Sequence, residues 1–148
     1  PQVGRMEEFQ FPQKKLVLNL SKNPAGFNQG IATVQLDDSY KDVIIAINDN
    51  IQDGKDVSWL WDVDFEKLQE HVRHITTCGI RRHDMLIRLK YADFQNISTA
   101  ASMKEAVRAA LESDSEIVYV LVNYSALFPT HGMLTELLKE EETGRDQG

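Results

Sequence analysis

The sequence predicts one α/β domain: a Rossmann-like, mostly parallel sheet with helices on both faces. Two continuously apolar runs, at 43–47 and 117–122, are typical of parallel strands covered on both sides. Segments with apolar residues at helical spacing lie between the apolar runs, so strands and helices alternate along the chain. The length of 148 residues is usual for one domain of this class.

Each element follows from a local pattern. We expect strands at 16–20, 43–47, 72–77 and 117–122, and helices after Asn23, around 85–89, at 102–111 and at 127–138. Asn23 is a good N-cap and Pro24 fits the first helical position. In the second helix we expect Arg88 on a side other than the apolar one. We place the domain at residues 1–139 and expect a flexible, charged tail at 140–148.

Composition excludes several classes of protein. A net charge of −7 argues against a nucleic-acid partner, because phosphate binding needs a basic face. A single cysteine, Cys78, rules out an internal disulfide and a multi-cysteine zinc site, and we expect no metal site. No apolar run is long enough for a transmembrane segment. The N-terminus has neither a signal peptide nor an initiator Met, so we expect a fragment of a longer protein.

Two loops follow strands and could handle ligands: 21–26 and 48–62. The second loop holds both tryptophans and a cluster of aspartates. Long loops after buried strands are often functional. The alternative is a solvated turn at Asp53-Gly54, with Trp59 and Trp61 packed on the core. A calcium loop does not fit the acidic spacing, and the chain lacks a P-loop for ATP.

Several motifs together resemble the C-terminal domain of the MurT family of Mur ligases. Gly4-Arg5-Met6-Glu7 is similar to the segment that leads into this domain in Mur ligases and folylpolyglutamate synthases. Lys22-Asn23-Pro24 is similar to their His-Asn-Pro segment, with Lys22 in place of His. The acidic loop 48–62 is the most specific match, and the resemblance runs from about residue 4 to 138.

The resemblance implies a two-protein enzyme. The MurT family pairs with GatD, a glutaminase subunit that releases ammonia from glutamine. With that ammonia and ATP, the enzyme converts the D-glutamate of the lipid II stem peptide to D-isoglutamine in peptidoglycan synthesis. ATP and magnesium are held mainly by a central domain that this sequence lacks, so we expect the isolated domain to be inactive. The resemblance also implies a bacterial cytoplasmic protein that acts at the inner membrane face.

The resemblance assigns roles to residues as well. By position, Asp56 is the aspartate that the family's C-terminal domain supplies to the Cys–His pair of GatD. Arg5, Lys22 and Asn23 are expected at the cleft between domains, near the nucleotide. Asp53, Ser58 and Asp62 are expected on the partner-facing loop, with Asp53 as a turn residue and Asp62 as a helix cap before Phe65.

Two other functions remain open at this point. The acidic loop could belong to a non-catalytic docking domain that only grips a glutaminase partner. A phosphate-accepting receiver domain is the other alternative, although Asp49 is badly placed for that chemistry and no acidic pair follows the first strand.

Overall fold

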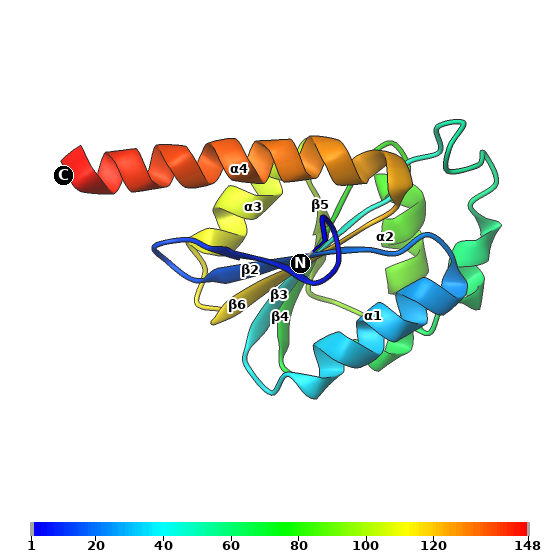
Figure 1. Ribbon diagram of the computed structural model, residues 1–148. Coiled ribbons are helices and arrows are strands. Elements are labelled where there is room, and N and C mark those ends of the chain that lie inside the picture. The colour runs from blue at the N-terminus through cyan, green and yellow to red at the C-terminus, as the bar shows by residue number, and fades with distance from the viewer. Residues whose placement is uncertain (1, 148) are drawn as a thin grey trace.

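The computed structural model describes residues 2–147. Within them the chain forms a six-stranded sheet in the order β1-β2-β6-β3-β4-β5, in which only the β1–β2 pair is antiparallel (Figure 1). The strands are β1 Glu7–Gln10, β2 Lys15–Leu20, β3 Lys41–Ala46, β4 Val72–Cys78, β5 Ile97–Thr99 and β6 Ile117–Val122. The helices are α1 Pro24–Leu36, α2 Arg82–Tyr91, α3 Met103–Leu111 and α4 Tyr124–Gln147, and two 3-10 helices are η1 Ser58–Asp62 and η2 Phe65–Lys67.

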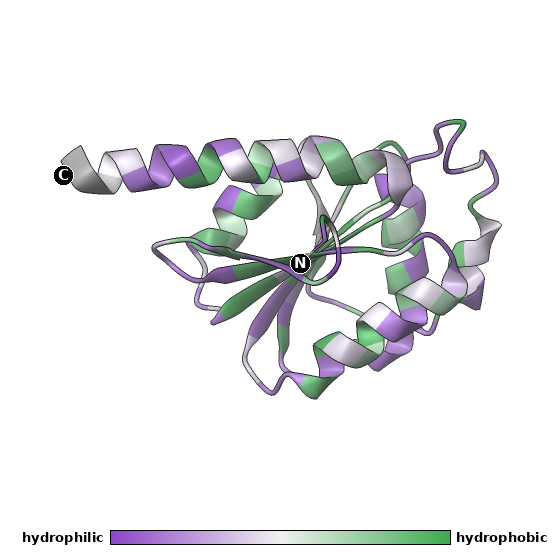
Figure 2. Cartoon of the chain, in the orientation of Figure 1, coloured by the Kyte–Doolittle hydropathy of each residue, from purple (hydrophilic) through white to green (hydrophobic). Residues whose placement is uncertain are grey.

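Helices cover both faces of the sheet, which confirms the predicted fold class. One apolar cluster joins α1, α2, η1 and η2 to one face, and a second joins α3 and α4 to the other. Strands β3 and β6 lie at the centre of the sheet, and every residue in both is buried. Figure 2 shows the apolar residues of the sheet between these two layers of helices.

The structure differs from the sequence expectation at three places. Strands β1 and β5 were not predicted, and both are short strands at the edges of the sheet. Helix α4 continues to Gln147, so residues 140–147 are helical where we expected a flexible tail. Helix α4 crosses residue 139 without a break, so the domain boundary that we placed there stays a prediction.

Strand register aligns the loops that carry the candidate residues. Leu20 of β2 and Ala46 of β3 both pair with Val122 of β6, and Ala46 also pairs with Cys78 of β4. Four parallel strands therefore end level with one another. The segments that follow them meet at this carboxyl edge, where α/β folds usually bind ligands.

Candidate functional site

An asparagine pair joins two of the loops at the carboxyl edge. The side-chain oxygen of Asn123 accepts from the backbone N–H of Asn48 at 3.1 Å, and its amide nitrogen donates to the Asn48 carbonyl at 2.8 Å. Asn48 also accepts from the backbone N–H of Ile80 through its own side chain, at 2.8 Å. These bonds tie together the ends of β3, β4 and β6.

Asp53 fastens the tip of the acidic loop to the start of α4. Its Oδ1 accepts from the Ser125 backbone N–H at 2.9 Å, and its Oδ2 accepts from the Ser125 hydroxyl. The chain turns here, since the N–H of Gly54 reaches the Asn50 carbonyl at 3.0 Å and Gly54 has a φ of +86°. Only a residue that tolerates positive φ fits this position. The prediction that Asp53-Gly54 forms the turn is confirmed.

Asp56 presents an exposed and oriented carboxylate. Its Oδ1 accepts from the backbone N–H of Ser58 at 2.8 Å, which holds the side chain across the loop. This backbone bond, the Ser58 side chain and the positive charge of Arg81 hold the pKa of the Asp56 carboxyl below its usual value. Asp56 is therefore ionised near neutral pH and can accept a further hydrogen bond from outside the chain.

A shallow hollow of about 340 Å³ lies beside Asp56. Its walls combine the loop residues Asp56 and Ser58 with the apolar side chains of Trp61 and Ile87. Arg81, which also lines the hollow, is ion-paired with Asp84 at 2.8 Å and with Asp49 at 3.2 Å. The Arg81 guanidinium is thus already engaged, and the Asp56 carboxylate remains exposed.

Two expectations about the loop are wrong. Asp62 does not cap the helix before Phe65: it is the last residue of η1, and η2 begins after Asp64, whose side chain makes no capping hydrogen bond. Asp64 occupies the N-cap position of η2, and buried Val63 lies between it and Asp62, so Asp62 is two residues too early to cap this helix. Trp59 packs against the core through Phe27, with ring centroids 5.5 Å apart, as expected. Trp61 does not, because 52% of it is exposed.

Arg88 is buried, contrary to the sequence expectation. Only 4% of it is exposed, and its guanidinium donates to the carbonyls of Leu60 at 2.9 Å and Val63 at 2.7 Å. It also pairs with Glu66 at 2.8 Å. The helical spacing could have predicted this burial, because Arg88 comes three residues after buried Met85 and so lies on the same face of the helix.

The three residues expected at the domain cleft lie together. Arg5, Lys22 and Asn23 line one depression of about 430 Å³ beside the first turn of α1. Asn23 is also the N-cap of α1, since its side chain accepts from the Gly26 N–H at 2.8 Å. The Lys22 ammonium lies 5.6 Å from the centre of the Tyr124 ring. Two cations beside a helix N-terminus favour an anionic group.

The site offers a carboxylate, and the thiol of this chain is not available as a nucleophile. Cys78, the only cysteine in the sequence, is 1% exposed, and burial raises the pKa of its thiol to about 11. A thiol in that state is unreactive. Residues 2–147 contain no group of three His, Cys, Asp or Glu side chains that could hold a metal, and no helix among them could cross a membrane.

The six-stranded sheet and its two layers of helices give the chain the fold of a domain that is found in Mur-type ligases. The structure is similar to folylpolyglutamate synthase from Thermotoga maritima, with a TM-score of 0.65 and 19% identity over 95% of this chain and 32% of that chain. It is also similar to MurF ligase from Thermotoga maritima in complex with ADP, with a TM-score of 0.61 and 11% identity over 98% of this chain and 32% of that chain. These likenesses show the fold.

Sequence comparison identifies the family. A sequence model described as MurT ligase C-terminal matches residues 20–127, and the chain belongs to this family. It is 33% identical over 144 residues to the lipid II isoglutaminyl synthase (glutamine-hydrolyzing) subunit MurT of Staphylococcus aureus strain COL, covering 96% of this chain and 32% of that protein. The Streptococcus pneumoniae R6 subunit of the same name is 28% identical over 134 residues, covering 88% of this chain and 30% of that protein. The chain spans about a third of the length of these relatives.

Proposed function

We propose that this chain is the C-terminal part of the MurT subunit of a glutamine-dependent amidotransferase. The complete enzyme uses ATP to convert the D-glutamate of the lipid II stem peptide to D-isoglutamine, in the cytoplasm at the inner face of the membrane. Support comes from the relatives, whose name describes a glutamine-hydrolysing lipid II isoglutaminyl synthase and calls each of them a subunit. A GatD-type glutaminase is the second subunit in this proposal.

Within that enzyme, Asp56 completes the glutaminase site of the partner subunit. A cysteine nucleophile paired with histidine works best when a third group fixes the imidazole tautomer and stabilises the imidazolium. The observation that carries this role is the exposed Asp56 carboxylate, oriented by Ser58 and kept ionised. The buried Cys78 of this domain is not that nucleophile, and in our proposal the Cys–His pair belongs to the glutaminase subunit.

The depression around Arg5 and Lys22 fits the nucleotide side of the enzyme. In our proposal ATP and magnesium are bound mainly by the rest of the protein. Arg5 offers a fork of donors, and Lys22 a point charge at the N-terminus of α1. Both suit a phosphate or an acyl phosphate, while Asn23 keeps the first turn of the helix in place.

The central test is Asp56→Asn in the full-length protein with its glutaminase subunit. The change keeps the shape of the side chain and removes its charge, so glutamine hydrolysis should fall by up to about 10⁴-fold, as for an orienting aspartate in a serine triad. Ammonia release would be measured alongside subunit binding by calorimetry, and binding should persist. Asp62→Asn is the matched control, an exposed aspartate of the same loop that should retain activity.

The same experiment decides between catalysis and docking. Exposed apolar side chains beside Asp56, such as Trp61, are the observation that favours a docking domain. If Asp56→Asn weakened binding but left the turnover of the saturated complex intact, the loop would only grip the partner. If Asp62→Asn abolished ammonia release while Asp56→Asn did not, the catalytic carboxylate would be Asp62.

A further inference from the structure

We infer that Trp61, Ile87 and Tyr91, here called the α2 patch, form the surface on which the glutaminase subunit docks to reach Asp56. The inference rests on the proposed function, which makes a separate subunit bring its histidine to the Asp56 carboxylate. It goes further by naming the residues that hold the two proteins together.

The α2 patch is a cluster of large apolar side chains held out in solvent. The exposed fractions are 52% for Trp61, 47% for Ile87 and 73% for Tyr91. Ile87 and Tyr91 are four residues apart and lie on one face of α2. Trp61 and Tyr91 meet edge to face, with ring centroids 5.3 Å apart. Single exposed apolar residues are ordinary, but a contiguous group with two aromatic rings is typical of an interface.

The side chain beneath the patch makes it rigid. The Arg88 guanidinium lies 5.2 Å from the centre of the Trp61 ring and 5.4 Å from that of Phe65. It is fixed in turn by its bonds to the carbonyls of Leu60 and Val63. Trp61 is therefore held on a buried cation and can bind without losing much conformational entropy, which is the property of an interface anchor.

The patch is continuous with the Asp56 site. Trp61 and Ile87 line the same hollow as Asp56, so the catalytic carboxylate lies at the border of an apolar surface. A protein whose active site reaches Asp56 must cover these side chains, and this places the glutaminase on the patch. The complementary surface is therefore an apolar pocket.

The other depression of the domain is built from different elements. Arg5 lies in the turn before β1, and Lys22 and Asn23 precede α1. The α2 patch is formed by η1 and α2, and α2 packs on β4 and β5, at the opposite end of the strand order from β1. A ligase core bound at the Arg5 depression thus leaves the α2 patch available for a second protein.

The experiment uses the full-length protein and its purified glutaminase subunit. Ile87→Asp and Tyr91→Asp would each be titrated against the glutaminase by calorimetry, with Leu36→Asp as the matched control. Leu36 is 84% exposed at the end of α1, outside the patch. Both patch variants should raise the Kd at least about tenfold, and Leu36→Asp should leave it unchanged. Thermal melts should match the wild type, since all three sites are exposed.

Glutamine turnover at saturating glutaminase separates this inference from the proposed function. The patch variants should regain near-wild-type ammonia release once the complex is saturated, because Asp56 is intact. Normal Kd values in both patch variants would overturn the inference, even if Asp56→Asn abolished ammonia release. The inference would also be overturned if the patch variants bound the glutaminase normally but self-associated less than the wild type. That result would assign the patch to a second copy of this chain. Loss of binding in the patch variants would support it, even if Asp56→Asn retained activity and the catalytic proposal failed.

Discussion

Three aspartates of one loop have different roles because their hydrogen-bond partners differ. Asp53 accepts bonds from Asn50 and Ser125, so both carboxylate oxygens serve the structure of the loop. Asp56 accepts from Ser58 and remains exposed, with a lowered pKa. Asp62 ends η1 without capping the next helix. The candidate for catalysis is therefore the aspartate that is oriented but not enclosed.

Lys22→Ala tests the role of the depression beside α1. In the full-length enzyme the change should raise the KM for ATP or for the lipid substrate several-fold, because it removes a cation from a site suited to phosphate. Initial-rate kinetics of the complete amidation would measure it. Lys67→Ala is the control, a lysine that is 72% exposed on η2.

Comparing Lys22→Ala with Asn23→Ala separates an effect on ligand binding from an effect on stability, because Asn23 is the N-cap of α1. Asn23→Ala should lower the free energy of unfolding by about 1 kcal/mol, the usual cost of losing an N-cap, whereas Lys22→Ala should leave it unchanged. Unaltered kinetics in Lys22→Ala would contradict a role in binding and leave this segment with only its capping function.

At the scale of the elements, the loop between β3 and β4 is fastened on both sides of Asp56. Its first half is tied to the start of α4 through Asp53 and Ser125. Its second half, with η1 and η2, is tied to α2 by Arg88. Between these two ties lies Asp56. Catalytic groups need support of this kind, because a carboxylate displaced by about 1 Å orients its histidine poorly.

Arg88→Ala should therefore destabilise the domain and loosen the loop. It leaves the buried carbonyls of Leu60 and Val63 without their donor, so the free energy of unfolding should fall by about 2–4 kcal/mol. Urea denaturation followed by tryptophan fluorescence would measure this. Lys90→Ala, on an exposed position of the same helix, should change it by less than about 0.5 kcal/mol. Equal stabilities for the two variants would show that Arg88 does not fasten the loop.

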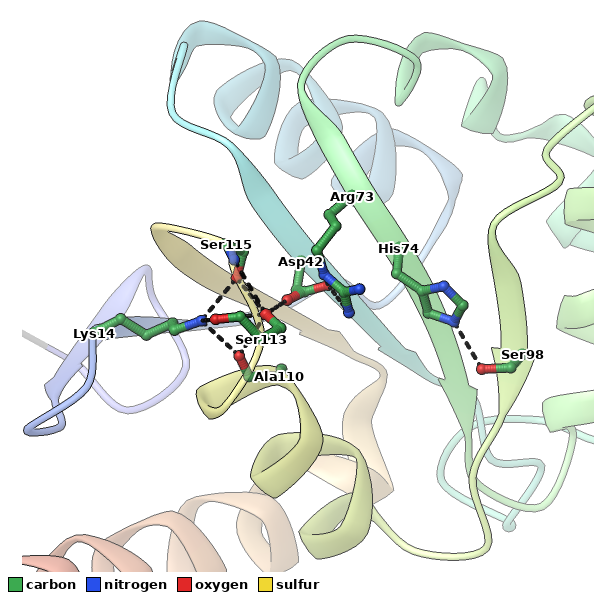
Figure 3. Close-up of polar contacts among 8 residues, drawn as sticks. All are labelled: Lys14, Asp42, Arg73, His74, Ser98, Ala110, Ser113 and Ser115. Carbon is green, nitrogen blue, oxygen red and sulfur yellow. Dashed lines mark hydrogen bonds and ion pairs between the residues drawn. The ribbon is translucent and has the colours of Figure 1, made fainter.

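A second polar network supports the opposite end of the sheet (Figure 3). Buried Lys14 donates to the carbonyls of Ala110 at 2.7 Å and Ser113 at 2.9 Å, which closes the C-terminal end of α3. Buried Asp42 pairs with Arg73 at 2.9 Å and accepts from the Ser113 hydroxyl. Because these groups satisfy one another, we interpret this end of the domain as a structural support for β3 and β4.

At the scale of the whole molecule, the two proposed activities lie on different surfaces. The nucleotide-facing depression is next to β1 and α1, and the glutaminase-facing hollow is next to η1 and α2. Both open near the level ends of the parallel strands. A domain with this arrangement can contact a ligase core and a glutaminase at the same time.

The isolated domain should fold but hydrolyse no ATP. Its two apolar clusters cover both faces of the sheet, which is sufficient for an independent core. Phosphoryl transfer needs phosphate-cradling and magnesium-holding groups, and the sequence has no P-loop. A phosphate-release assay on the purified domain would measure the rate. An ATPase rate proportional to domain concentration and abolished by Lys22→Ala would contradict the prediction.

Local sequence patterns were sufficient to predict the central architecture. The apolar runs of β3 and β6 favour strands that are covered on both faces, and Asn23-Pro24 favours the start of a helix. The acidic loop could be recognised as a candidate site because its residues are contiguous. Short edge strands such as β5 could not be predicted, since three residues become a strand only by pairing with a neighbour.

Roles that depend on distant partners required the folded chain. Asp53 and Ser125 are 72 residues apart in sequence, and Arg88 binds carbonyls 25 and 28 residues before it. Local spacing cannot predict these partners, because the side chains and the groups that they bind come together only when the strands have paired. The position of Trp61 also required the folded chain, because its large apolar side chain suggests a core residue. The carbonyls that bind Arg88 hold that guanidinium beneath the Trp61 ring, and this leaves the indole half exposed beside Asp56.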